Sequence, residues 1–278
     1  MAAIITLTTD FGLTDVYVAA MKGVILGINP EARLVDICHT IRPHRILQAA
    51  FVLSTAYLFF PPGTIHLVVV DPGVGTERRA IILKTPSASL VAPDNGVLSY
   101  IVEQFAAPET GNRLPSALSA VAITNPRFWR SPVSPTFHGR DIFAPVAAWL
   151  SRGYPPTDFG ETITSVVTLP LVHPRRTKDG GLVGTIIHVD NFGNLITSIR
   201  SADLPPATQS ITIEINNQRI HGLSRTYAEG NGLLALIGSS GYLEIALKES
   251  NSSTFLGATI GNEVRVRQGV DNELSRLQ

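Results

Sequence analysis

The sequence contains few of the residues that build disulfides and metal sites, and it has no surplus of charge. Its 278 residues include one cysteine, Cys38, so an internal disulfide is excluded, and its place after a predicted strand favours a buried thiol. The seven histidines form no HxxxH or HxH pair and CxxC is absent, so we expect no metal site. The 22 basic and 22 acidic residues cancel, which argues against a nucleic-acid surface.

Long apolar runs and several nucleotide-binding or nucleophile motifs are also absent. The longest apolar runs, such as Ile65–Val70, are far too short to span a bilayer. The N-terminal segment lacks both a basic region and an apolar stretch of secretory length. Walker A, GxGxxG and GxSxG patterns do not occur. We therefore expect a soluble cytoplasmic protein, with no membrane partner, whose chemistry uses none of these motifs.

The first half of the chain alternates strand-like and helix-like segments. A helix capped by Thr14 or Asp15 and a second helix over 46–59 separate three apolar strands. This β-α-β-α-β order predicts an α/β N-terminal domain over 1–170, with a largely parallel sheet flanked by helices. The strands and later elements are expected at Ile4–Leu7, Arg33–Ile37, Ile65–Val70, Ala80–Lys84 with Ser89–Ala92 as a hairpin, Asn95–Gln104 as a helix, Ala120–Thr124, and Asp141–Ser151 as a helix.

The pattern changes at residues 171–181, a polar stretch with proline and glycine that is typical of a linker. Helical periodicity largely ends there. Short alternating runs separated by turn-forming sequences follow, and they predict a small all-β barrel or sandwich over 182–278. These runs are Leu182–Val189, Leu195–Ile199, Ser210–Ile215, Arg219–His221, Leu233–Ile237, Tyr242–Leu247 and Glu263–Arg267.

Polar residues stand where predicted strands end. Asp10, in the sequence TTDFG, lies between the first strand and the first helix. A carboxylate there can accept two hydrogen bonds from a ribose diol, or it can cap the helix or a turn. In open α/β sheets, ligands collect at such strand ends, so Asp10 is a candidate binding residue.

The sequence VVVDPGVGTERRA combines a buried strand, a carboxylate, a glycine turn and two arginines. Glycine lets the backbone turn tightly after Asp71, and Arg78 and Arg79 stay protonated, so they can fix an anion or orient a carboxylate. A structural salt bridge that stiffens the loop is the alternative. These residues are candidates for a site at the strand end.

Two further segments carry polar groups beside apolar runs. His138, in FHGRDIFAP, precedes a predicted helix, where a neutral imidazole can act as a base or orient a water molecule. The segment DNFGN, from Asp190 to Asn194, follows an apolar strand and offers a carboxylate, an aromatic face and an amide. A β-turn stabilised by the aspartate side chain is the alternative explanation of that segment.

Taken together and in order, eight segments resemble the S-adenosyl-L-methionine (SAM) hydrolases, also called SAM hydroxide adenosyltransferases. That family is related to enzymes that fluorinate or chlorinate SAM. The resemblance covers nearly the whole chain and implies an α/β N-terminal domain with a β-barrel C-terminal domain. The segments are TLTTDFG, MKGVI, VDICHTI, VVVDPGVGTERRAI, APDNGVLS, PTFHGRDIFAP, GTIIHVDNFGNLITSI and GSSGYLEIAL.

The resemblance implies roles for four residues of the first domain. Asp10 matches the carboxylate that holds the ribose hydroxyls. Asp71, Arg78 and His138 match the set that positions the attacking water. The residues alone do not decide whether Asp71 or His138 takes the proton.

The resemblance also implies roles for five residues of the second domain. Asp190 matches the residue that meets the methionine amine, and Ser239 matches a contact to the methionine carboxylate. Phe192 and Tyr227 match the aromatic faces around adenine, and Asn194 matches its hydrogen-bonding amide.

Four differences separate this chain from the halogenating relatives. Asp71 stands where they carry tyrosine, and Gly139 stands where the fluorinating enzyme carries a halide-binding serine. Ser240 replaces an arginine of the fluorinating relatives, and only six residues separate Lys84 from Val91, where the fluorinating enzyme has an insertion.

The expected activity is therefore hydrolysis of SAM to adenosine and L-methionine by water attacking C5′, with no cofactor. The resemblance implies a homotrimer with its sites between neighbouring subunits. Halide-dependent cleavage of SAM and a non-catalytic module that binds SAM or adenosine are the alternatives.

Overall fold

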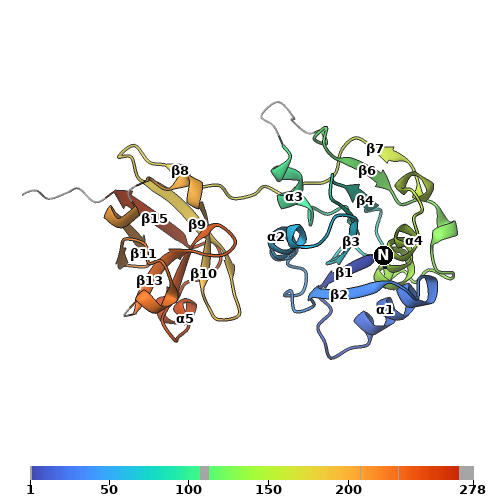
Figure 1. Cartoon of the computed structure of the whole chain (residues 1–278), viewed down its shortest axis with the longest axis horizontal. Coiled ribbons are helices and arrows are strands. Elements are labelled where there is room, and N and C mark those ends of the chain that lie inside the picture. The colour runs from blue at the N-terminus through green and yellow to red at the C-terminus, as the bar shows by residue number, and fades with distance from the viewer. Residues whose placement is uncertain (1, 107–112, 207, 231, 269–278) are drawn as a thin grey trace, which may run out of the picture. The chain divides into compact units, whose positions relative to one another are not determined.

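The chain folds into two compact units, one formed by residues up to Leu171 and one from Val172 onward. Figure 1 shows both in the computed structural model, which describes residues 2–106, 113–206, 208–230 and 232–268. Each unit has its own sheet and its own apolar core, so each is described by itself.

The first unit is built on a seven-stranded sheet in the order β2-β1-β3-β5-β4-β6-β7. Its central strands are buried on both faces, as expected where helices cover a sheet on both sides. The strands are β1 (Ile4–Thr9), β2 (Arg33–Cys38), β3 (Thr64–Val69), β4 (Ala80–Lys84), β5 (Ala88–Pro93), β6 (Ser119–Ala122) and β7 (Thr162–Ile163).

The sheet is mixed, which corrects the expectation of a largely parallel sheet. β2, β1, β3 and β5 run parallel, as the β-α-β-α-β pattern predicts. The turn after Lys84 then sends the chain back, and β4 pairs antiparallel with β5, as the predicted hairpin requires. The pairs β4–β6 and β6–β7 are also antiparallel. The connection between β4 and β5 is too short for a crossover helix, so this half cannot be parallel.

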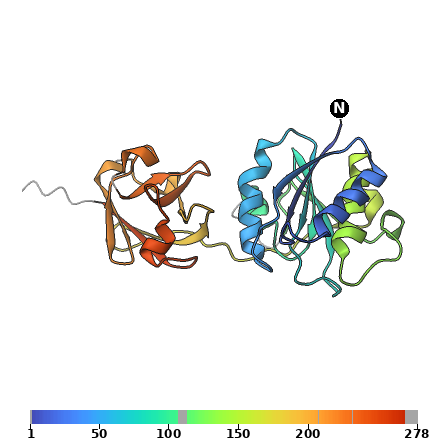
Figure 2. The same cartoon turned by 90° about the horizontal axis from the view of Figure 1, so that it is seen from below.

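Helices cover both faces of this sheet. α1 (Tyr17–Ile28) and α4 (Ala144–Ser151) pack on one face, and α2 (Ile46–Ala56) and α3 (Ser99–Gln104) pack on the other (Figure 2). Each face therefore has a separate apolar core, with Met21 in one and Leu53 in the other. The shorter helical turns of this unit are η1 (Tyr57–Phe59), η2 (Pro126–Phe128), the π-helix η3 (Gly139–Phe143) and η4 (Pro156–Phe159).

Two local expectations are wrong in detail. α1 begins at Tyr17 after Val16, and no side chain caps its first turn, so neither Thr14 nor Asp15 plays that part. Cys38 is only half-buried, because it lies on β2 at the edge of the sheet.

The parallel register places two candidate residues side by side. Thr9, the last residue of β1, pairs with Val69, the last residue of β3. The next residues along these chains lead to Asp10 and Asp71, so both carboxylates leave the same edge of the sheet. This is the strand-end position at which α/β sheets gather ligands.

The second unit is an antiparallel sheet in the order β12-β11-β15-β9-β10-β14-β13, and β8 pairs with β9. β12 also contacts β13, so the sheet is a nearly closed barrel. β8 consists of Arg175–Arg176 and lies within the segment expected to be a linker. The strands are β8, β9 (Leu182–Val189), β10 (Leu195–Arg200), β11 (Ile211–Ile215), β12 (Gln218–His221), β13 (Leu233–Ile237), β14 (Tyr242–Leu247) and β15 (Glu263–Gln268).

One helix of this unit was not expected. α5 (Ser252–Leu256) forms in a stretch whose asparagine and serines are typical of a loop. Asn251 caps it by accepting a hydrogen bond from the Thr254 backbone N–H. The remaining turns are η5 (Ser201–Asp203), η6 (Thr208–Ser210) and η7 (Tyr227–Glu229).

A buried histidine lies in the centre of the first sheet. His66 on β3 is fully buried, and its Nδ1 atom is 2.8 Å from the Thr6 hydroxyl on β1. Its Nε2 atom has no hydrogen-bond partner among the described residues, and the rings of Tyr57 and Phe60 contact it edge-on. Burial lowers the pKa of His66 to about 4. The folded protein therefore holds this imidazole neutral.

We expect His66 to make the first unit sensitive to acid. The unfolded chain binds a proton at this site near pH 6.5 and the folded chain only near pH 4, so stability falls as pH decreases through this window. His66→Phe removes this linkage, although losing the Thr6 contact costs about 1 kcal/mol at neutral pH. Urea unfolding at pH 7 and pH 4.5 should show a loss about 2–3 kcal/mol smaller in the variant. Equal losses in both proteins would contradict this assignment.

Candidate active site

Arg78 joins two candidate residues that are far apart in the sequence. Its Nε atom donates to Asp71 Oδ1 at 2.8 Å, and its Nη2 atom donates to Asp71 Oδ2. Nη2 also lies 3.0 Å from Nδ1 of His138. Only 11% of the Arg78 side chain and 5% of the Asp71 side chain are exposed, so this is a buried, forked ion pair with an imidazole attached.

The guanidinium also fixes the state of the imidazole. A guanidinium has only donors, so Nδ1 of His138 must accept, and the ring hydrogen of the neutral imidazole is on Nε2. Burial and the charge of Arg78 lower the pKa of His138, against the opposing effect of Asp71 and Asp141. The structure therefore favours a neutral His138 that donates through Nε2.

The loop that carries Asp71 and Arg78 is shaped by close backbone packing. Gly75 has φ 78°, in the left-handed region, and a Cβ atom there would lie 2.5 Å from the carbonyl oxygen of Pro135. Any larger residue would push this loop away from the segment that leads to His138. Glycine at this position is thus what lets the two segments approach each other.

The segment that carries His138 is held by a buried carboxylate. Asp141, in the π-helix η3, has no exposed surface and accepts a fork of hydrogen bonds from Arg140 at 2.7 and 2.8 Å. It also accepts from the Ser134 backbone N–H at 2.9 Å. Burial opposes its ionisation, but these hydrogen bonds keep the pKa of Asp141 below its usual value. The sequence motif contained Asp141, and only the fold shows that it anchors the loop.

A cavity of about 300 Å³ brings three of the predicted residues together: Asp10, Asp71 and His138. Asp10 accepts a hydrogen bond from the backbone N–H of His44 at 2.9 Å, and His44 has φ 66°. A positive φ is uncommon for a residue with a side chain and often marks functional sites. No sequence signal singled out His44. The aromatic rings of Phe11, Tyr17 and Phe137 contact one another at the same cavity.

In the second unit, Asp190 and Asn194 form one turn. Asp190 Oδ1 accepts from the backbone N–H groups of Phe192 and Asn194 at 2.9 and 2.8 Å, and its Oδ2 accepts from the Asn194 amide at 2.9 Å. This is the aspartate-stabilised turn that was the alternative explanation. The Phe192 ring is left largely exposed, whereas Asn194 is buried. The turn therefore presents an aromatic face to solvent.

Tyr227 is connected to this part of the barrel through a residue that the sequence did not single out. Its hydroxyl donates to Oε1 of Glu244 at 2.6 Å, and Glu244 is paired in register with Ile196, two residues after Asn194. Burial raises the pKa of both Tyr227 and Glu244, and the nearby charge of Asp190 adds to this effect. A carboxylate in the strand sequence YLEIAL was the only signal for Glu244.

Ser239 lies in the tight turn between β13 and β14 and is exposed. Backbone hydrogen bonds from Gly238 to Tyr242 and from Gly241 to Gly238 close this turn. The five candidate residues of the second unit thus belong to three segments of the barrel, and Glu244 touches two of them, Tyr227 and Gly238.

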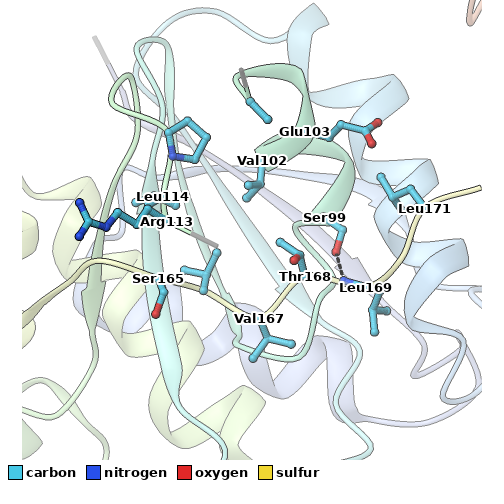
Figure 3. Close-up of a pocket in the computed structure, with 13 residues that line it drawn as sticks. Ser99, Val102, Glu103, Arg113, Leu114, Ser165, Val167, Thr168, Leu169 and Leu171 are labelled. Carbon is cyan, nitrogen blue, oxygen red and sulfur yellow. Dashed lines mark hydrogen bonds between the residues drawn. The ribbon is translucent and has the colours of Figure 1, made fainter. Parts of the chain in front are cut away.

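A larger cavity of the first unit, about 560 Å³, contains none of the predicted residues. It lies beside α3 and the segment 165–171 (Figure 3). Three hydroxyl side chains line it, those of Ser99, Ser165 and Thr168. Ser99 is already used, because it donates to the Gly96 carbonyl at 2.6 Å and accepts from the Leu169 N–H at 2.8 Å. We therefore place the candidate active site at the smaller cavity.

Within the described residues, no group of three or more His, Cys, Asp or Glu side chains is arranged to hold a metal ion. Among the same residues, every helix is too short or too polar to cross a bilayer.

Comparison with known proteins identifies the family of this chain. Residues 5–160 match the SAM hydroxide adenosyltransferase N-terminal domain, and residues 184–265 match the C-terminal domain of the same name. The chain belongs to the SAM hydroxide adenosyltransferase family. The resemblance inferred from the eight sequence segments is thereby confirmed.

Three proteins show the range of similarity. The (R)-S-adenosyl-L-methionine hydrolase of Salinispora tropica is 38% identical over 268 residues, which cover 95% of this chain and 98% of that protein. A fluorinase of Nocardia brasiliensis is 26% identical and covers 96% and 97% of the two chains. The crystal structure of an uncharacterized conserved protein from Thermotoga maritima is 34% identical, with a TM-score of 0.85 over 95% of this chain and all of that chain.

Arg79, next to Arg78, serves a different purpose. It donates to Asp94 Oδ2 at 2.8 and 2.5 Å and to the Ser165 carbonyl, and the buried Asp94 also accepts from the Val167 N–H. Arg79 and Asp94 therefore connect the segment 165–167, near the end of the first unit, to the sheet.

We expect Arg79→Ala to lower the free energy of unfolding by about 1–3 kcal/mol, because the buried Asp94 carboxylate loses its cation. Denaturant unfolding measures the change. Lys22→Ala, which breaks the exposed pair with Asp36, is the matched control, with an expected loss below about 1 kcal/mol. If both variants lose equally little, the Arg79 pair has no stabilising role.

Proposed function

We propose that this chain hydrolyses SAM to adenosine and L-methionine, by attack of a water or hydroxide on C5′. The curated relatives, named as hydrolases of (R)-SAM, support this activity. The observation that carries the proposal is the Asp71–Arg78–His138 arrangement at the cavity where β1 and β3 end. We further propose the (R) configuration at sulfur for the substrate, as those names specify.

The chemistry of SAM explains why such a site needs few groups. The sulfonium leaves C5′ as a neutral thioether, so the leaving group needs no acid and no cofactor has to activate it. The difficult partner is the nucleophile, because neutral water is weak. A catalyst must hold one water in line with the C5′–sulfur bond and stabilise its developing negative charge.

Arg78 and His138 supply that stabilisation in our proposal. The Nη1 atom of Arg78 carries two further donors that no described residue accepts, and the neutral imidazole carries another at Nε2. We assign His138 as a donor to the attacking oxygen and not as its base, because its Nδ1 atom already accepts from Arg78. The proton of the water then passes to Asp71 or to solvent.

The substrate contacts follow the family resemblance. We propose that Asp10 holds the ribose hydroxyls, that Phe192, Asn194 and Tyr227 contact adenine, and that Asp190 and Ser239 contact methionine.

The shape of the site disfavours the halide-dependent alternative. A Cβ atom on Gly139 would lie 3.3 Å from each of Met21, Phe137 and Val69, so the backbone there is tightly enclosed. A serine like that of the fluorinating enzyme would require these side chains to move. The buried Asp71–Arg78 pair also occupies the end of β3. The first feature separates this site from that of the fluorinating enzyme, and Asp71, in place of the tyrosine of the halogenating relatives, favours water as the nucleophile.

Incubation with each sulfur epimer of SAM, in heavy-oxygen water and with or without halide, tests the proposed function. We expect adenosine labelled at O5′, independent of halide and faster from the (R) epimer. A 5′-halogenated nucleoside would instead support the halide reaction, and unchanged SAM would support a binding module. Adenosine without the label would contradict direct displacement by water.

Arg78→Ala should lower kcat by about a hundredfold, because an anion-stabilising donor acts mainly in the transition state. The affinity for SAM, measured by calorimetry on this slower variant, should change far less. Arg79→Ala is the matched control, since its guanidinium binds Asp94, and its kcat should stay near that of the wild type. A severe Arg79→Ala together with a mild Arg78→Ala would contradict the assignment of these two residues.

We also propose, from the family resemblance, that the enzyme is a homotrimer in which neighbouring chains contribute to each site. Co-expressed Asp10→Ala and Asp190→Ala chains, each inactive alone, should then form mixed trimers in which some sites carry neither lesion. Purification through two tags and an assay of SAM loss should show partial recovery of activity. Confirmed mixed trimers without recovery would indicate that each site is built within one chain. A cytoplasmic location stays a prediction, which cell fractionation tests.

A further inference from the structure

Glu244 is a carboxylate on the outward face of a barrel strand. Its neighbours Leu243 and Ile245 point into the barrel core, so the alternation of β14 sends Glu244 to the other face. There it is only 6% exposed, although a carboxylate on the outer face of a barrel is normally solvated. Tyr227 and Gly238 lie against it.

Two segments of the second unit meet at this carboxylate. The Tyr227 hydroxyl donates to Oε1 at 2.6 Å. Oε2 lies against Gly238, where an added Cβ atom would be 2.4 Å from it. Gly238 begins the turn that carries Ser239, and glycine is the residue that permits this close approach. One side chain therefore contacts both the segment of Tyr227 and the turn of Ser239.

The arrangement is costly for stability alone. No cation pairs with Glu244 among the residues that the structure describes, and a buried carboxylate without one is unfavourable. Burial and the nearby charge of Asp190 raise the pKa of Glu244, although the hydrogen bond from Tyr227 opposes this. An apolar residue would cover the strand at lower cost. Burial at such a cost is typical of a residue that serves a site.

We propose that Glu244 is a positioning residue for substrate binding, which fixes the ring of Tyr227 and the Ser239 turn relative to each other. The inference rests on the proposed function, in which Tyr227 contacts adenine and Ser239 contacts methionine. The segment of Tyr227 and the turn of Ser239 would then bind opposite ends of one SAM molecule at a fixed separation. Glu244 itself touches neither the reacting carbon nor the attacking water.

The test compares Glu244→Ala, Glu244→Gln and Tyr227→Phe, with Glu263→Ala as the control, an exposed carboxylate on β15 of the same unit. Glu244→Ala should raise the KM and the calorimetric Kd for SAM roughly tenfold, with kcat changed less than about threefold, because the loss is in binding and not in the chemical step. Glu244→Gln should restore most of the affinity, since its amide oxygen still accepts from Tyr227. The control should match the wild type.

A double-mutant cycle separates positioning from simple destabilisation. If Glu244 acts through the Tyr227 hydroxyl, Glu244→Ala should change the Kd for SAM less than about twofold in the Tyr227→Phe background. Independent, multiplying effects would overturn the inference. So would an unchanged Kd in Glu244→Ala, or a Glu244→Gln variant as impaired as Glu244→Ala. If the variants change the Kd for SAM as expected but the wild type forms no adenosine, the proposed function is contradicted and the positioning role of Glu244 is not.

Discussion

The candidate site depends on one guanidinium. Arg78 binds Asp71, seven residues earlier on the same loop, and His138, sixty residues later on another. Because the guanidinium can only donate, it orients the carboxylate of Asp71 and sets the tautomer of His138 at once. Arg78 also makes a cation–π contact, because its guanidinium carbon lies 5.1 Å from the centroid of the Phe143 ring. Its contact with His138 is the polar link between the two loops in the part of the chain that the structure describes.

Buried contacts behind the two loops hold the Asp71–Arg78–His138 arrangement in place. The two loops meet where Gly75 passes the Pro135 carbonyl, and Asp141 ties the second loop to the π-helix that follows His138. β1 and β3 hold the other ends of the cavity in parallel register. The binding residues are therefore on loops while the precision comes from buried anchors behind them.

Much of the fold and part of the candidate site could be predicted from the sequence. The parallel strands, the hairpin of β4 and β5 and the strands of the barrel follow from apolar runs and turn residues, and the strand-end rule brings Asp10 and Asp71 to one edge. What could not be predicted depends on packing. The bond from His44 to Asp10 needs a residue with positive φ, and α5 forms because Asn251 caps it. Glu244 is buried only because a distant segment folds over its strand. The His44 bond and the burial of Glu244 have no local signature, whereas the Asn251 cap is a local signal in a stretch that otherwise resembles a loop.

The adjacent arginines make the junction with β4 sensitive to length. Arg78 and Arg79 directly precede β4, and one binds Asp71 while the other binds Asp94. Side chains along a strand alternate between its two faces, so a single residue inserted between Arg79 and Ala80 would exchange the directions of the two guanidiniums. An insertion in the turn before Arg78 would leave these directions unchanged. Related chains that keep the site should therefore conserve the spacing between the two arginines and the strand that follows them.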